Sequence, residues 1–122
     1  MTLEEAGKEL GINLDAALER FAGNEGLYLK FLNKMLTDPT FPALENAVRE
    51  KDLKAVERAA HTLKGVSANL GLDDLSGRCA DIVQAVRTDE TAAQDDMEVL
   101  FGACRQAYEK MVFVLQKMSQ GE

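Results

Sequence analysis

The longest apolar pattern in the sequence lies near its C-terminal end and has helical spacing. From about residue 92 to residue 118, apolar side chains recur every three or four positions, as on one face of a helix: Met97, Leu100, Phe101, Cys104, Tyr108, Met111, Val112 and Leu115. No stretch of the chain shows the sustained alternation of apolar and polar residues that is typical of a strand. These patterns predict an all-α protein.

Capping residues and glycines divide the remainder of the chain into shorter helices. The expected helices cover about residues 3–10, 14–22, 25–36, 41–50, 53–70, 74–87 and 92–118. In the third of these, one side carries Leu27, Phe31, Leu32 and Met35. The connections are short, so long neighbouring helices should run antiparallel. We therefore expect a single domain over residues 1–122, an antiparallel four-helix bundle (about 41–118) with additional short N-terminal helices (about 3–36).

The charge and the cysteines limit the classes of function. A net charge of −7 argues against a nucleic-acid-binding protein, which would present a basic surface, and against binding to an anionic membrane. No apolar segment approaches the ~20 residues of a membrane span, and no leader sequence is visible, so we expect a cytoplasmic protein. Cys79 and Cys104 occupy apolar helical positions and are expected as buried free thiols rather than as a disulfide. With a single histidine, the chain lacks the usual ligands for a structural zinc site.

The single histidine lies on the predicted outer face of the fifth helix. The apolar stripe of that helix consists of Leu53, Val56, Ala60, Leu63, Ser67 and Leu70. At about 100° per residue, His61 points roughly 130° from the centre of the stripe, Gly65 almost directly away from it, Ala68 roughly 110° and Lys64 roughly 70°. A glycine inside a helix costs roughly 1 kcal/mol relative to alanine, so its place beside an exposed histidine calls for an explanation.

Phosphoryl transfer would explain this arrangement. A neutral imidazole is a good nucleophile near neutral pH because its ordinary pKa is about 6.5. A phosphoryl group on His61 would bring negative charge, which Lys64 can neutralise from the same edge of the helix. The missing side chain at Gly65 leaves room for that group and for a partner, and Ala68 extends the bare strip. The alternative is a surface histidine without function beside an incidental glycine.

The segment HTLKGVSANLG, residues 61–71, resembles the signature of histidine-containing phosphotransfer (Hpt) domains. The signature is a histidine, any residue, then leucine, lysine and glycine, followed by small residues and a second glycine. Here these positions are His61, Leu63, Lys64, Gly65 and Gly71. Residues 14–36 are similar to the segment that precedes the motif in bacterial members, and residues 72–86 to the helix that follows it. The resemblance covers roughly residues 12–115.

The resemblance implies that the chain is a phosphorelay intermediate and not an enzyme. His61 would accept a phosphoryl group from an aspartate of one receiver domain and pass it to another, with Lys64 stabilising the group and Gly65 giving access. Gln84 is a counterpart of a glutamine that some members place near the ring. Val66 and Ala68 would belong to the partly exposed apolar surface on which receivers dock in this family, although an apolar residue such as Val66 can also be the edge of the core. The receiver would supply Mg²⁺, so we expect no cofactor or metal of this chain's own, no nucleic-acid or membrane partner, and a monomer.

Other interpretations also fit the sequence. One alternative is the phosphoaccepting domain of chemotaxis-type histidine kinases, which has a very similar motif. A chain that begins at Met1 and carries no further domain favours a free-standing carrier over that alternative. A domain excised from a longer protein is also compatible with the sequence. A helical adaptor that is never phosphorylated is a second alternative. A helical enzyme with His61 as general base is a third, but no orienting carboxylate or pocket is apparent. The acidic residues outside the motif are expected to form a solvated rim, and secondarily to select a receiver: Asp73, Asp74, Asp81, Asp89, Glu90, Asp95 and Asp96.

Overall fold

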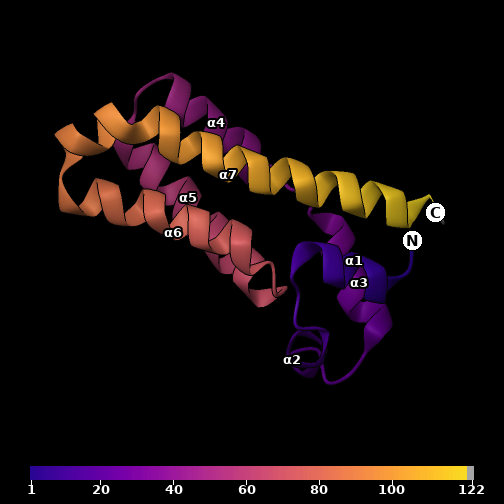
Figure 1. Cartoon of the computed structure of the whole chain (residues 1–122). Coiled ribbons are helices and arrows are strands. Elements are labelled where there is room, and N and C mark those ends of the chain that lie inside the picture. Colours follow the sequence, from indigo (N-terminus) through magenta and orange to yellow (C-terminus); the bar gives the residue numbers. More distant parts are fainter. Residues whose placement is uncertain (121–122) are drawn as a thin grey trace.

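A computed structural model describes residues 1–120, which fold into seven α-helices (Figure 1). In chain order these are α1 (Leu3–Leu10), α2 (Leu14–Glu19), α3 (Glu25–Lys34), α4 (Thr40–Arg49), α5 (Leu53–Asn69), α6 (Asp73–Thr88) and α7 (Glu90–Ser119). No strand occurs within residues 1–120. The predicted all-α class is confirmed.

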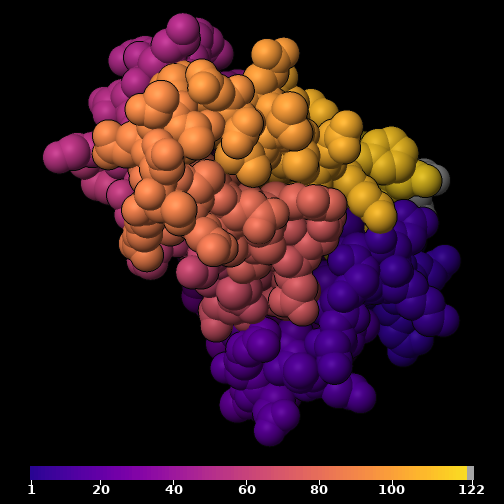
Figure 2. All heavy atoms as spheres, turned by 60° about the vertical axis from the view of Figure 1, so that its left-hand side comes forward, coloured from indigo at the N-terminus to yellow at the C-terminus, as the bar shows by residue number. Residues whose placement is uncertain are grey.

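Four helices close into a ring around the core. Helix α4 packs against α5, α5 against α6, α6 against α7, and α7 returns to α4. Because only short turns join successive members, each helix runs antiparallel to the one before it (Figure 1). The short helices α1, α2 and α3 lie together at one end of this bundle, where α1 packs on α7, and Figure 2 shows the N-terminal segment in indigo against that end. The predicted bundle with additional N-terminal helices is therefore confirmed.

Several helix boundaries differ from the sequence prediction by one to three residues, α3 for example ending at Lys34 rather than near residue 36, and two of the differences have a clear local reason. Helix α2 ends at Glu19 rather than near residue 22, because the chain turns there: the Gly23 amide donates to the Leu18 carbonyl at 2.9 Å, and Gly23 has a φ of 73°. Helix α7 begins at Glu90 rather than near residue 92, because the Asp89 side chain accepts hydrogen bonds from the Thr91 and Ala92 amides. A side-chain cap thus adds residues to the start of α7.

One face of α5 is buried in the centre of the ring. Val56, Ala60 and Leu63 are at most 1% exposed, and the only polar member of the stripe, Ser67, is completely buried. The Ser67 hydroxyl donates to the Leu63 carbonyl at 2.6 Å, which removes the cost of an unpaired buried hydroxyl. Burial of this stripe sets the rotation of α5 about its own axis.

The C-terminal end of α5 is held by the short helices. The Tyr28 hydroxyl, on α3, donates to the Leu70 carbonyl at 2.6 Å, and Tyr28 is completely buried. The Arg20 guanidinium donates to the Ala68 and Asn69 carbonyls at 3.2 and 3.3 Å. Since α5 has no basic residue in its own last turn, Arg20 supplies the positive charge that a helix C-terminus favours. The N-terminal segment therefore holds the C-terminal end of α5 in place.

We expect Tyr28→Phe to lower the free energy of unfolding by about 1–2 kcal/mol at pH 7, because the buried Leu70 carbonyl loses its donor while the ring packing is kept. Burial also raises the pKa of Tyr28 to about 12, above the ordinary tyrosine value of about 10. A raised pKa means that this contribution is complete below pH 10 and is lost as the pH rises toward 12. Urea unfolding between pH 7 and pH 12 measures both effects.

Tyr108→Phe is the matched control for Tyr28→Phe, since Tyr108 is only half-buried and should matter less at pH 7. Burial, together with the nearby Asp38, also raises the pKa of Tyr108. In Tyr108→Phe, the loss of stability between pH 10 and pH 12 that remains is therefore the loss due to Tyr28. Equal stability of Tyr28→Phe and the unmodified chain at every pH would show that the hydrogen bond to Leu70 contributes nothing.

Candidate functional site

His61 and Gly65 lie one turn apart on the outer face of α5, and both are exposed. A Cβ atom placed on Gly65 would meet no atom within 4 Å, so the surface above Gly65 is open. Lys64, between them in sequence, is half-buried, as are Val66 and Ala68. The angular positions on the helix thus predict the observed exposure. The site is an imidazole next to a bare stretch of helix.

The backbone at Lys64 is tied to the neighbouring helix. The Ser76 hydroxyl, on α6, donates to the Lys64 carbonyl at 3.0 Å, and the Ser67 hydroxyl lies 3.2 Å from the same oxygen. Within residues 1–120, no carboxylate oxygen lies within 4.0 Å of the Lys64 ammonium, whereas three arginines there form ion pairs. The Lys64 backbone is therefore held while its charge is available to a bound anion.

An ion pair crosses from α5 to α6 one turn before the histidine. The Arg87 guanidinium, on α6, contacts the Glu57 carboxylate, on α5, at 2.5 Å. His61 follows Glu57 by one turn, and Gln84 precedes Arg87 by one turn. The two helices are antiparallel, so moving from Glu57 to His61 along α5 and from Arg87 to Gln84 along α6 leads in the same direction in space. Gln84 therefore lies within about one helical turn of His61, measured along the helix axes. Gln84 is exposed at this edge.

Sequence reasoning missed Glu57 and Arg87 as neighbours of the site. Each is a charged residue on the outer side of a helix, and nothing in its own segment sets it apart. Their pairing depends on the register between α5 and α6, which the sequence does not provide. The available signal was weak: Glu57 precedes His61 by four residues, the spacing that places two side chains on one face of a helix.

An apolar surface adjoins the other side of α5. Val66 and Asn69 line a shallow groove together with Phe31 and Lys34 of α3. Phe31 is 40% exposed, and Leu27, one turn earlier on α3, is 39% exposed. Of the four apolar residues that the sequence places on one side of this helix, Leu32 and Met35 are buried and the other two are exposed. Phe31 and Leu27 are an addition to the predicted site. Ala68, which the sequence predicts at the site, accepts a hydrogen bond from Arg20 at its backbone carbonyl.

Neither a cluster of typical metal ligands nor a membrane-spanning helix is found in the described part of the chain. Within residues 1–120, no three side chains of the His, Cys, Asp and Glu type gather closely enough to hold one. In the same part of the chain, none of the helices combines the length and the apolar character that crossing a membrane requires.

The Hpt domain family model matches residues 30–113 of the chain, from the second half of α3 to most of α7. The chain belongs to the Hpt domain family. Hpt domains are phosphocarrier modules that take part in histidine phosphotransfer in phosphorelays and interact with receiver domains. Comparisons with curated proteins and with solved structures give no significant match. The matched range of this Hpt domain includes the single histidine of the chain, and α1 and α2 precede it.

Proposed function

We propose that this Hpt domain accepts a phosphoryl group on His61 from the aspartate of one receiver domain and passes it to another receiver. The observation that supports this most strongly is the position of the chain's only histidine, exposed on α5 beside the open surface at Gly65. In this proposal the whole chain, residues 1–122, acts as a single monomeric domain in the bacterial cytoplasm. Its partners are receiver domains, not nucleic acid or membranes.

The transfer step uses the neutral imidazole as a nucleophile. A ring nitrogen of His61 attacks the phosphorus of the receiver's phosphoaspartate, an N–P bond forms, and the P–O bond to the aspartate breaks. The aspartate carboxylate leaves with the bonding electrons, and a phosphorylated imidazole that carries a proton on its other nitrogen can release it to water. Mg²⁺ belongs to the receiver's acidic site, so this chain contributes only the nucleophile and its surroundings.

Positive charge on both sides of His61 suits the phosphorylated state. Lys64 supplies an ammonium group from the same helix edge, at a backbone position that Ser76 holds. Arg87 supplies a second cation from α6, and Glu57 keeps it beside the site when no phosphoryl group is bound. Gln84 adds a side-chain amide near the level of the ring. Lys64, Arg87 and Gln84 thus stabilise the product of transfer, and Glu57 only holds Arg87 in place before transfer.

The docking surface for the receiver extends from the histidine toward α3. Gly65 and Ala68 leave the helix bare, and Val66 adds an apolar edge. Phe31 and Leu27 continue that edge as exposed apolar side chains, which a soluble domain uses for contact with a partner. We propose that the acidic residues outside the motif act at the rim of this surface, where charge selects among receivers.

Phosphoryl transfer from a receiver tests the proposal directly. Incubated with labelled phospho-receivers of its source organism, the unmodified chain should acquire an acid-labile, alkali-stable label, and His61→Gln should acquire none. His61 is exposed, so this substitution should leave urea unfolding unchanged. Absence of label from every receiver would reject the carrier in favour of an adaptor. Label that appears only with a kinase module would favour the chemotaxis-type phosphoacceptor.

We expect Lys64→Ala to slow transfer by at least about 10-fold, because a charge-assisted contact to the phosphoryl group is lost. The bundle should remain folded, since Lys64 contributes no side chain to the core. Lys54→Ala, at an exposed position in the first turn of α5, is the matched control and should transfer at the unmodified rate. Equal rates for the two variants would remove Lys64 from the mechanism.

We expect Gly65→Gln to make the fold more stable and the carrier less active. Glutamine is the better helix former by about 0.5–1 kcal/mol, and the side chain enters open space, so the free energy of unfolding should rise. The same side chain would cover the approach to His61 and slow transfer by at least about 10-fold. Gly102→Gln, at a helical glycine of α7 with equally open surroundings, should be stabilised without slower transfer. Unchanged transfer by Gly65→Gln would contradict the proposed role of Gly65.

A further inference from the structure

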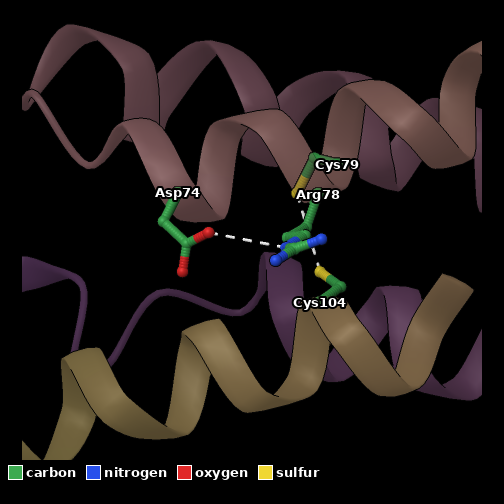
Figure 3. A network of polar contacts seen from close by, with 4 residues as sticks. All are labelled: Asp74, Arg78, Cys79 and Cys104. Atoms are coloured by element: carbon green, nitrogen blue, oxygen red, sulfur yellow. Dashed lines mark hydrogen bonds and ion pairs between the residues drawn. The ribbon is translucent and has the colours of Figure 1, made fainter.

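The two cysteines of the chain lie against each other in the core (Figure 3). Cys79 comes from α6 and Cys104 from α7, and both are completely buried. Their Sγ atoms are 3.7 Å apart, close enough for one thiol to donate a hydrogen bond to the other. In this structure both are free thiols, which agrees with the sequence expectation. The phosphoryl site uses neither of them.

The contact is more specific than packing alone requires. A single buried cysteine acts as a small apolar residue, and many positions in a core accept one. Here the only two cysteines, 25 positions apart in sequence, face each other across one helix pair. Within residues 1–120 no group of three ligating side chains includes them, so a metal does not account for their meeting.

We propose that Cys79 and Cys104 form a redox-active pair that a hydroperoxide oxidises to a disulfide linking α6 to α7. A disulfide has an S–S length of about 2.05 Å, so the sulfur atoms must approach by about 1.7 Å from their observed 3.7 Å. Rotation about the Cα–Cβ bonds and a small shift of two helices already in contact supply this movement. The pair needs no other side chain.

The step balances with hydrogen peroxide as the oxidant. A thiolate of the pair attacks one peroxide oxygen, the O–O bond breaks, and a sulfenic acid and water are formed after proton transfer. The second thiol then attacks the sulfenic sulfur, the S–O bond breaks, and a second water leaves as the disulfide forms. Both sulfur atoms are oxidised, and both peroxide oxygens are reduced to water. A dithiol reductant reverses the change.

Whichever thiol reacts first with the peroxide, the other one can resolve the sulfenic acid, because the two Sγ atoms are in contact. The hydrogen bond between the two thiols and the burial of the site raise the pKa of the Cys79 thiol. Because both are buried, peroxide reaches them only when α6 and α7 separate transiently, and a neighbouring thiol already in contact captures the sulfenic acid before further oxidation.

The disulfide would stabilise the helix pair next to the phosphoryl site. It joins the middle of α6, three residues from Ser76, to the middle of α7, and closes a loop over a separation of 25 residues. A cross-link of this kind restricts the unfolded chain more than the folded one. We therefore expect the oxidised chain to melt about 5–10 °C above the reduced chain.

The full chain tests this inference without a receiver. After incubation with hydrogen peroxide, the intact mass should fall by two hydrogen atoms, and the unfolded product should have no thiol left to alkylate. Dithiothreitol should restore both thiols and the original melting temperature. Cys79→Ala and Cys104→Ala are the controls: neither can form the internal bond, so peroxide should not raise the melting temperature of either.

Three results would overturn the inference. Two alkylatable thiols after peroxide treatment would show that the pair does not react, and oxygen addition or disulfide-linked dimers would show that the sulfur atoms do not capture each other. An oxidised chain that melts no higher than the reduced chain would reject the stabilising cross-link. Should an alanine variant fail to fold, mass and thiol content of the unmodified chain still decide the question. The outcome is independent of phosphoryl transfer.

Discussion

Burial of one face of α5 fixes the direction in which His61 points. The stripe that includes Val56, Ala60 and Leu63 is enclosed by α4, α6 and the core, so α5 has one rotation about its axis that hides its apolar residues. At that rotation His61 and Gly65 face outward. A turn of the helix by one residue, about 100°, would expose apolar side chains and move the imidazole toward a neighbouring helix. The hydrophobic stripe therefore sets the geometry of the candidate site.

The ends and edges of α5 limit its other movements. Tyr28 and Arg20 bind the carbonyls at its C-terminal end, and Ser76 binds the Lys64 carbonyl from α6. Together these contacts restrict sliding along the axis as well as rotation about it. A site built on a packed helix keeps its side chains in place better than one built on a loop. The short N-terminal helices thus support the helix that carries the histidine.

The sequence predicts the parts of the site that depend on one helix alone. Exposure of His61 and Gly65 follows from the rotation per residue and the position of the stripe, and the buried Ser67 fits the same stripe. The ion pair between Glu57 and Arg87 does not follow, because it requires the register between two helices that pack only in the folded chain. The roles inferred for individual site residues remain predictions.

Helix α3 shows that helical periodicity does not predict how much of an apolar face is buried. Leu27, Phe31, Leu32 and Met35 share one side of α3 in the sequence pattern, yet only Leu32 and Met35 are buried. An amphipathic pattern identifies the apolar face of a helix. How much of that face is buried depends on how the neighbouring helices pack against it. Phe31 therefore adjoins the groove beside Val66 instead of completing the core. Similarly, the sequence placed both cysteines in the interior but did not predict their contact.

The proposed function requires that His61 be an accessible nucleophile in the folded chain. Phosphorus NMR of the protein after incubation with phosphoramidate, a small phosphoryl donor, tests this without a receiver. Because the chain has a single histidine, one phosphorus signal of a phosphorylated imidazole, lost in acid and kept in alkali, assigns the group to His61. We expect that signal in the folded protein. Its absence, under conditions in which free imidazole is phosphorylated, would contradict the claim.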